Sequence, residues 1–210
     1  MTGKFDYKKE YTDLYLPKES PMLIAVPEMS FIMTDGSGDP QGKEYQNALS
    51  CLYALSFTIK MNKMGGKQPD GYFEYVVPPP EGLWWCEDGV FSFTERANWC
   101  WTSMIRQPEF VTEEVFLRAK EECIRKKPES DFSGTRLTSF TEGLCVQALH
   151  IGSYASEPKT IAQMQEFMSQ QGLRDETGAA KKHHEIYLSD PRKTSLDKLK
   201  TVLRHPVAKA

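Results

Sequence analysis

Two short stretches of the sequence, DGSGDP at residues 35–40 and IGSYASEP at residues 151–158, decide the fold. In each stretch a strand-like segment leads into a Gly-Ser turn, and an acidic residue followed by proline then opens a helix. A glutamate-bearing segment follows each helix, FEYVVP at residues 73–78 in the first half and HEIYLSDP at residues 184–191 in the second. Because four features recur in the same order, the sequence predicts an internal duplication.

Apolar residues at helical spacing predict four helices. In the first helix Tyr45, Leu49 and Leu52 share one face, and Thr112 is placed to cap the second. The expected ranges are residues 44–61, 112–127, 158–171 and, at the C-terminus, 192–210. Basic residues alternate with leucines in the last range, so they are expected on a solvated helix face rather than in a nucleic-acid-binding patch.

Alternating apolar and polar residues predict the strands of an antiparallel sheet. They are expected around residues 31–33 and over residues 72–77, 99–105, 136–140 and 144–150. The last two ranges are expected to form a hairpin around Thr141-Glu142-Gly143. Proline lacks the N–H that a central strand needs, so Pro78-Pro79-Pro80 is expected to take the chain out of the sheet. These elements predict an α+β fold with the helices on one face of the sheet.

A single domain accounts for the whole chain of 210 residues. An N-terminal arm is expected over residues 1–27, with aromatic side chains that pack on the body of the domain. The first repeat is expected over about residues 28–98, the second over about residues 99–191, and the C-terminal helix over residues 192–210.

Composition excludes several classes of protein. The formal net charge is −3 with both signs interspersed, so no basic face for nucleic acid is expected. No apolar run approaches the roughly 20 residues that cross a bilayer, and the polar segment 1–15 does not resemble a secretory signal. The cysteines are odd in number and lack a CxxC spacing, so free thiols and a cytoplasmic location are expected.

The period of two along the strands gathers aromatic side chains and carboxylates on one side of the sheet. If the helices cover the aliphatic side, the other side is expected to carry these residues: Tyr72, Glu74, Trp99, Trp101, Glu185 and Tyr187. Large aromatic rings beside carboxylates are typical of a groove for a flat organic molecule. A planar aromatic small molecule is therefore the expected partner, bound by a monomer or a homodimer.

The histidines offer a weaker signal. His150 lies at a strand end before a Gly-Ser turn, where a hydrogen-bonded turn histidine is the favoured interpretation. His183 and His184 are neighbours of Glu185, but adjacent strand residues face opposite ways and no spacing supplies a third ligand. Neither a metal nor a cofactor is therefore expected.

Five stretches of the chain carry a resemblance to a known family. They are DLYLPK at residues 13–18, GSGDP at 36–40, WCWTSMIRQPEF at 99–110, HIGSYASEP at 150–158 and HHEIYLSDPRKTSLDKLKTVLR at 183–204. Together they resemble the GyrI-like family. The likeness is closest to its stand-alone bacterial branch, described as cyclopropanoid cyclopropyl hydrolases.

The resemblance implies a fold and an activity. The implied fold is a tandem pair of βαββ units (GyrI-like, SHS2-type) around a pseudo-two-fold axis, with a ligand groove between the halves. It also implies a glutamate on the penultimate strand, matched here by Glu185. The branch is linked to hydrolysis of the strained cyclopropane in yatakemycin- and duocarmycin-type DNA-alkylating compounds, and hence to detoxification and drug resistance. Relatives fused to helix-turn-helix domains sense cationic drugs, and no such segment flanks the domain in this sequence.

Ring opening by water requires a base, a hydrogen-bond donor for the dienone oxygen, and walls that hold a planar molecule. Glu185 is expected to be the base and Trp101 to place the substrate. Stacking and hydrogen bonding are expected from a wider group of ligand-binding residues: Phe57, Tyr72, Trp84, Trp85, Trp99, His150, Tyr154 and Tyr187. The sequence does not choose which tyrosine donates.

Each assignment has a structural alternative. Glu185 is also compatible with an exposed strand carboxylate paired with a lysine, and Trp99 and Trp101 with core residues of an aromatic sheet. Glu74 fits a structural or groove-rim position better than a catalytic one. A binding module that sequesters or senses aromatic, cationic ligands without changing them is the alternative function, with Glu185 as its counter-charge. An interaction with gyrase or another macromolecule ranks last.

Overall fold

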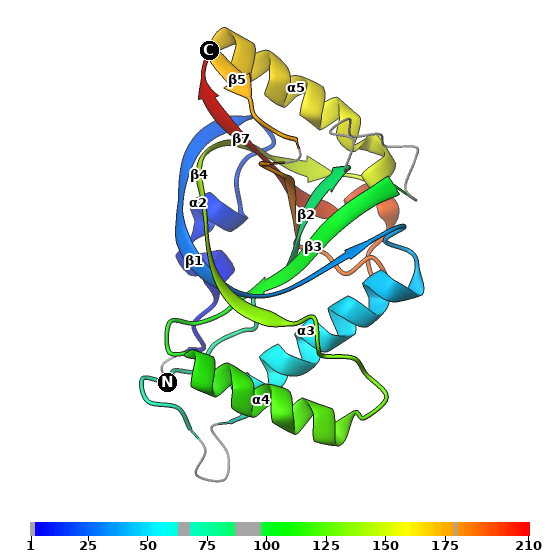
Figure 1. Ribbon diagram of the computed structural model, residues 1–210. Helices are drawn as coiled ribbons and strands as arrows, with labels where there is room; N and C mark the ends of the chain where they lie inside the picture. The colour runs from blue at the N-terminus through cyan, green and yellow to red at the C-terminus, as the bar shows by residue number, and fades with distance from the viewer. Residues whose placement is uncertain (1–2, 63–67, 87–97, 179) are drawn as a thin grey trace.

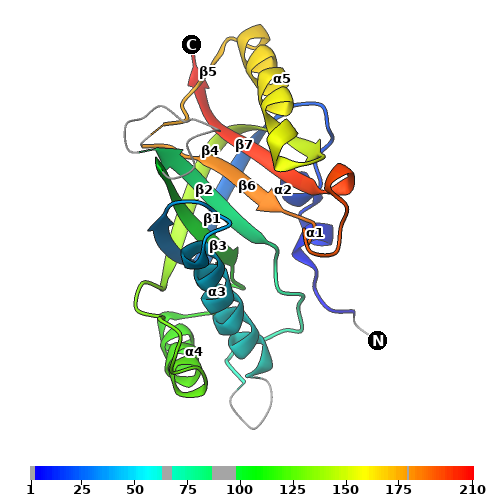
Figure 2. The ribbon, with the colours of Figure 1, turned by 90° about the vertical axis from the view of Figure 1, so that its right-hand side faces the viewer.

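The computed structural model describes residues 3–62, 68–86, 98–178 and 180–210. Six of its strands form a closed antiparallel ring in the order β4-β1-β3-β2-β6-β7, and pairing between β4 and β7 closes the ring. A short strand, β5 (Leu173–Asp175), pairs with the outer end of β7. Figures 1 and 2 show the long strands β1 and β4 curving around this ring, with the longer helices outside it and the short N-terminal helices against its inner side.

The chain order of these elements repeats. The first unit consists of β1 (Met22–Ser37), α3 (Lys43–Met61), β2 (Pro80–Cys86) and β3 (Trp99–Arg106). The second consists of β4 (Arg136–Ile151), α5 (Glu157–Gln170), β6 (His183–Tyr187) and β7 (Lys200–Lys209). Exchanging the two units maps the strand order of the ring onto itself. The predicted α+β fold with tandem βαββ units is therefore confirmed.

The remaining helices lie at the junctions of the chain. Helix α4 (Glu113–Lys126) connects the two units and packs against α3, with Thr112 accepting a hydrogen bond from Val115 N at 3.3 Å as the predicted N-cap. The short helices α1 (Tyr7–Glu10) and α2 (Thr12–Tyr15) precede β1. The N-terminal arm is shorter than expected, because β1 already begins at Met22.

The predicted hairpin over residues 136–150 is wrong. Residues 136–151 form one continuous strand, β4, which runs antiparallel to β1 from Arg136↔Met33 to Gln147↔Met22. Gly143 has a φ of +80°, a value that glycine adopts without strain. The glycine therefore allows a local distortion inside a long strand, where the sequence suggested a turn.

The predicted strand over residues 72–77 is also wrong. Only an isolated bridge between Phe5 and Tyr75 forms there, and the strand of the sheet is β2, which begins at Pro80. A proline is tolerated at the first residue of a strand. The three prolines therefore lead the chain into the sheet, whereas they were expected to lead it out.

The predicted C-terminal helix is a strand. Only Leu196–Lys198 forms a helical turn, of the 3-10 type (η3), and β7 follows it directly. Val202, Leu203 and Arg204 are all buried, because β7 pairs on both edges and is covered on both faces. The leucines are three and four residues apart, as in a helix. A strand that is buried on both faces need not alternate apolar and polar residues, so the spacing was misleading. The basic stretch is consequently not a solvated helix face.

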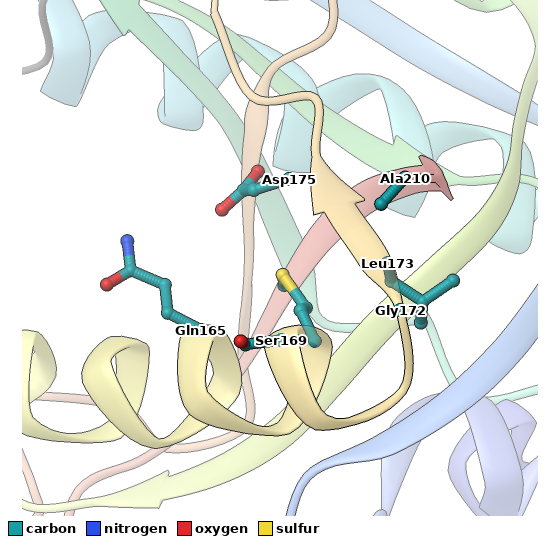
Figure 3. Close-up of a pocket in the computed structure, with 7 residues that line it drawn as sticks. Gln165, Ser169, Gly172, Leu173, Asp175 and Ala210 are labelled. Atoms are coloured by element: carbon teal, nitrogen blue, oxygen red, sulfur yellow. The ribbon is translucent and has the colours of Figure 1, made fainter.

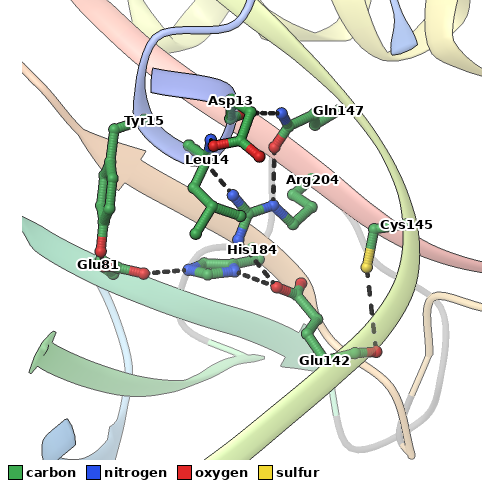
Figure 4. A network of polar contacts seen from close by, with 9 residues as sticks. All are labelled: Asp13, Leu14, Tyr15, Glu81, Glu142, Cys145, Gln147, His184 and Arg204. Atoms are coloured by element: carbon green, nitrogen blue, oxygen red, sulfur yellow. Dashed lines mark hydrogen bonds and ion pairs between the residues drawn. The ribbon is translucent and has the colours of Figure 1, made fainter. Parts of the chain in front are cut away.

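A network of buried charged side chains fills part of the ring interior (Figure 4). The Arg204 guanidinium donates to Glu142 Oε2 at 3.0 Å, to Gln147 Oε1 at 3.0 Å and to the Leu14 carbonyl of α2 at 2.9 Å. The His184 imidazole lies between Glu142 Oε2, at 3.0 Å, and Glu81 Oε2, at 2.9 Å. We call Glu81, Glu142, His184 and Arg204 the inner network.

Candidate functional site

The candidate site lies on the outer face of the sheet, where strands of the two units meet. The register places Glu185 of β6 opposite Gly82 of β2, and Gly82 opposite Ser103 of β3. One pleat further along, His183 lies opposite Trp84, and Trp84 opposite Trp101. The pairing between β2 and β6 thus brings the predicted glutamate beside the predicted tryptophans.

Aromatic rings from α3 and the sheet pack together at this place. Tyr45 of α3 lies 5.3 Å from Trp84 and 5.0 Å from Trp101, measured between ring centroids. Trp84 in turn lies 5.5 Å from Trp99 in an edge-to-face arrangement. We call Tyr45, Trp84, Trp99 and Trp101 the aromatic cluster. The cluster lies on the face that α3 covers, so the expectation that helices and tryptophans occupy opposite faces is wrong.

Two glycines make room for the indole rings. A Cβ atom at Gly36 would lie 2.3 Å from the Trp101 ring, and one at Gly82 would lie 2.7 Å from Trp84 Nε1. Both distances are far shorter than van der Waals contact. Any side chain at either position would displace an indole, so glycine here is required by the close approach of the rings.

Two tyrosines border Glu185. Trp84 Nε1 donates a hydrogen bond to the Tyr187 hydroxyl at 2.9 Å, and the Tyr154 ring lies edge-on to Tyr187 at 6.0 Å. Burial, and then the negative charge of Glu185, raises the pKa of Tyr154 to about 12 and the pKa of Tyr187 well above its ordinary value. Both hydroxyls therefore keep their protons at neutral pH and can donate hydrogen bonds.

Glu185 is 8% exposed, and its Oε1 lies 3.1 Å from His183 Nε2. Among the described residues no lysine or arginine pairs with it. Glu157, the first residue of α5, is 3% exposed, and its Oε1 has no hydrogen-bond partner in the described part of the chain. Burial, and then the charge of Glu185, raises the pKa of Glu157 well above its ordinary value. The site therefore combines a carboxylate with a second carboxyl group that tends to hold its proton.

A compact turn holds Tyr154 and Glu157 in place. The turn η2 (Tyr154–Ser156) precedes α5, and His150 lies under it, with Nδ1 2.8 Å from Thr160 Oγ1 and Nε2 3.0 Å from Ser156 Oγ. Gly152 has a φ of +142°, which permits the close approach of Ser156. His150 is thus the hydrogen-bonded turn histidine that the sequence favoured. Its contacts with Ser156 and Thr160 hold the turn that carries Tyr154 and Glu157.

Four residues expected near Glu185 lie elsewhere. Trp85 points to the opposite side of β2 from Trp84, and Lys182 Nζ lies 3.8 Å from its ring centre. The Tyr72 hydroxyl donates to the Lys60 carbonyl at 3.0 Å and lies within reach of Glu74 Oε1 at 3.5 Å. Phe57 is 47% exposed and packs beside Tyr53. The expectation for Tyr72 and Glu74 depended on a strand over residues 72–77, whereas Phe57 belongs to α3.

Several site residues escaped the sequence analysis, although some carried a signal. Extending the helical period of Ile161 and Met164 back by one turn places Glu157 on the buried face of α5. The period of two places His183 on the same face as Glu185. Tyr45 was identified only as an apolar residue of its helix, and nothing in its spacing marks it as a partner of the tryptophans.

No group of three or more histidine, cysteine, aspartate or glutamate side chains is arranged to hold a metal ion in the described part of the chain. No helix there is long and apolar enough to cross a bilayer. All five cysteines are buried free thiols.

Paired βαββ units with aromatic rings and a buried carboxylate at their junction define a domain that binds small organic molecules. Residues 20–208 match the GyrI-like small molecule binding domain, and the chain belongs to this family. None of the curated proteins matches significantly.

Solved structures of close relatives come from Listeria innocua. An uncharacterized conserved protein is 55% identical, with a TM-score of 0.94, and the match covers 98% of this chain and 100% of that chain. Two structures described as hydrolases are 52% and 53% identical, with TM-scores of 0.90 and 0.92 and the same coverage. The C-terminal domain of EcmrR is 12% identical, with a TM-score of 0.53 over 90% of this chain and 98% of that chain, and shows the fold alone.

Proposed function

We propose that this protein is a hydrolase that opens the strained cyclopropane of yatakemycin- and duocarmycin-type compounds by adding water, with Glu185 as general base. The observation that carries the proposal is Glu185 itself, a buried carboxylate beside an aromatic cluster and without a lysine or arginine partner among the described residues. An unneutralised carboxylate in an apolar setting is poised to take a proton rather than to stabilise the fold.

The comparisons support the hydrolytic class. Both hydrolases from Listeria innocua are more than half identical to this chain over almost its whole length. The match covers 98% of this chain and 100% of that chain, so the likeness is not confined to one of the two units. The cyclopropane substrate is the finer part of the proposal and rests on the family resemblance of the sequence.

The residues suggest a sequence of proton movements. Glu185 takes a proton from a water molecule as the water oxygen attacks the unhindered cyclopropane carbon. The C–C bond breaks, its electron pair enters the dienone ring, and the resulting phenolate takes a proton, so that one water is added overall. The hydroxyl of Tyr154 or Tyr187 stabilises the developing oxyanion by hydrogen bonding, because both remain protonated at neutral pH.

The aromatic cluster gives the substrate its orientation. Trp101 is 1% exposed and its Nε1 has no hydrogen-bond partner among the described residues. A rigid indole held by Tyr45 and Gly36 presents a fixed surface to a planar guest. Trp101 therefore positions the substrate, and Trp84 positions Tyr187 through their hydrogen bond.

The decisive experiment follows a duocarmycin-class cyclopropane compound by mass spectrometry with the parent protein, Glu185→Gln and Glu28→Gln. Glu28 is an exposed carboxylate on β1 and serves as the matched control. We expect a water-added, ring-opened product whose rate of formation falls by about 100- to 10,000-fold in Glu185→Gln and is unchanged in Glu28→Gln.

Two outcomes contradict the proposal. Equal rates for Glu185→Gln and the parent would remove Glu185 from the chemistry. An unchanged compound that still quenches tryptophan fluorescence would identify a binding module, with Glu185 as a counter-charge for an aromatic, cationic ligand.

A further inference from the structure

We propose that His183, His205 and Asp175 form a proton relay that connects Glu185 to the protein surface. Glu185 Oε1 lies 3.1 Å from His183 Nε2, His183 Nδ1 lies 2.8 Å from His205 Nε2, and His205 Nδ1 lies 2.7 Å from Asp175 Oδ2. These contacts link β6, β7 and β5 in one unbroken chain. Its role in turnover rests on the proposed function, whereas its protonation pattern does not.

The far end of the chain reaches solvent. The Asp175 side chain is 23% exposed, while the side chains of His183 and His205 are each 6% exposed. Asp175 borders a cavity of about 250 Å³ between α5 and β5, together with Gln165 and Ser169 (Figure 3). Protons can therefore enter or leave the chain at Asp175 and are shielded from water between its ends.

Counting the protons shows that two neutral imidazoles supply hydrogens for only two of the three contacts. Each of the three contacts joins two groups that repel each other unless a hydrogen lies between them. If Asp175 is a carboxylate, His205 Nδ1 donates to it, and His205 Nε2 must accept from His183 Nδ1. His183 Nε2 then faces Glu185 without a hydrogen. The third contact therefore gains its hydrogen only when Glu185 takes a proton, as it does from the attacking water.

The pKa shifts along the chain agree with this placement. Burial, and then the neighbouring His183, lowers the pKa of His205 even though Asp175 opposes the shift. The pKa of Asp175 is lowered because the hydrogen bond and charge of His205 and the Thr177 backbone outweigh its burial. Both lowered pKa values favour a neutral His205 imidazole and an ionised Asp175 carboxylate at rest, as the count assumes.

Transfer along the relay restores the base. When Glu185 has taken the proton of the attacking water, it passes this proton to His183 Nε2, the Nδ1 proton of His183 passes to His205 Nε2, and the Nδ1 proton of His205 passes to Asp175. Both imidazoles then carry their hydrogen on Nε2, and His183 donates to Glu185. Only protons move, and the charge leaves the site without a solvent path through the aromatic cluster.

Other ionisable groups also face Glu185. They are Tyr45 from α3, Tyr154 from η2, Glu157 from α5 and Tyr187 from β6. All four have raised pKa values, so each tends to stay neutral. In the relay, by contrast, a single substitution can reverse the direction in which the hydrogen bonds are donated.

Asp175→Asn is expected to reverse the direction of the hydrogen bonds along the relay. Asp175 Oδ1 accepts a hydrogen bond from Thr177 N at 2.9 Å, so the asparagine oxygen is expected to stay there and its amide nitrogen to face His205 Nδ1. The amide then donates to His205, His205 donates to His183, and His183 donates to Glu185. Glu185 therefore stays ionised to lower pH, because its imidazole partner always presents an N–H.

The test measures both tautomers and activity. In ¹⁵N-histidine-labelled protein, NMR is expected to show His205 with its hydrogen on Nδ1 in the parent and on Nε2 in Asp175→Asn. The acid limb of the kcat/KM profile against pH is expected to move down by about one pH unit. Glu176→Gln removes the same charge from the neighbouring residue, which pairs only with Arg174 and Lys181 among the described residues, and is expected to change neither.

The outcomes separate the relay from the proposed function. Hydrogen on His205 Nε2 in the parent, or an unchanged tautomer in Asp175→Asn, overturns the relay whatever the activity. If the variant fails to fold, the tautomer of His205 in the parent protein still tests the relay. Confirmed tautomers with no hydrolysis of any cyclopropane compound would leave the relay in place and overturn the proposed reaction.

Discussion

His183 and His184 are neighbours on β6, but they face different surroundings. His184 points into the ring, where it contacts Glu81 and Glu142 and shares Glu142 with Arg204. His183 points to the outer face, where it contacts Glu185 and a second imidazole, that of His205. The inner network thus pairs two carboxylates with two basic groups, whereas Glu185 and Glu157 share the outer site with no lysine or arginine partner among the described residues.

The difference appears in the pKa values. Burial opposes ionisation of Glu142, yet His184 and Arg204 lower its pKa to about 2. Burial likewise opposes protonation of His184, yet Glu142 and Glu81 raise its pKa to about 9. At the outer site burial and Glu185 act in the same direction on Glu157 and raise its pKa. Compensated charges stabilise a single structure, while uncompensated ones remain available for proton transfer.

The largest expected effect comes from breaking the compensation inside the ring. Arg204→Met removes the donor to Glu142 and leaves a buried carboxylate with only His184 beside it. The free energy of unfolding is expected to fall by about 3–5 kcal/mol in urea denaturation. Arg174→Met removes an arginine whose side chain is 66% exposed and is expected to cost less than about 1 kcal/mol. Equal losses in both variants would show that the inner network is not a stabilising unit.

An intermediate effect is expected from removing one outer carboxyl group. The folded-state pKa of Glu157 is raised above 4.5, so its contribution to stability is present below pH 4.5 and is lost as pH rises through the raised value. Glutamine does not ionise, so Glu157→Gln does not lose stability in this way as pH rises. Between pH 4.5 and the raised pKa of Glu157, the free energy of unfolding of the variant relative to the parent should therefore increase by up to about 1.4 kcal/mol per pH unit.

The matched control for this measurement is Glu166→Gln, an exposed glutamate on the same helix. Its difference from the parent is expected to stay constant with pH. If Glu157→Gln also showed a constant difference between pH 4.5 and 8, the two outer carboxyl groups would not be coupled.

The smallest effect is expected from Tyr187→Phe. Trp84 Nε1 loses its acceptor at 2.9 Å, which is expected to lower the free energy of unfolding by about 0.5–1.5 kcal/mol. A red shift of tryptophan fluorescence should accompany the loss if Trp84 moves. Tyr53→Phe, at a half-buried tyrosine on the exposed side of α3, provides the control. An effect no larger than the control would show that this hydrogen bond does not hold Trp84.

The sequence predicted the architecture from the two Gly-Ser turns, because each turn belongs to a βαββ unit whose order survives in the chain. It misplaced β2 because Phe73 and Tyr75 alternate like a strand, although they pack against the arm and Phe110. It misplaced β7 because a strand buried on both faces has no period of two. Alternation of apolar and polar residues identifies a strand only when one of its faces is exposed, so it does not identify a strand of this ring that is covered on both faces.

The site was predictable in part for a related reason. Glu185 and Trp101 could be found because they lie within motifs of the chain and face the same side of the sheet, on strands that β2 separates. The contacts among Asp175, His183 and His205 depend on the register of β5, β6 and β7, which no local pattern specifies. Side chains that meet only through strand pairing remain invisible until the pairing is known.

Closure of the ring by β7 has a consequence for how the chain folds during synthesis. β7 follows every other strand in the chain, and it supplies hydrogen-bonding partners to β4, β5 and β6. Until residues 200–209 leave the ribosome, β4 and β6 each present an open edge, and Glu142 and His184 lack Arg204. Unpaired strand edges make an incompletely folded chain prone to aggregation. The last strand of the domain in chain order is therefore the one that closes the sheet and supplies the arginine that pairs with Glu142.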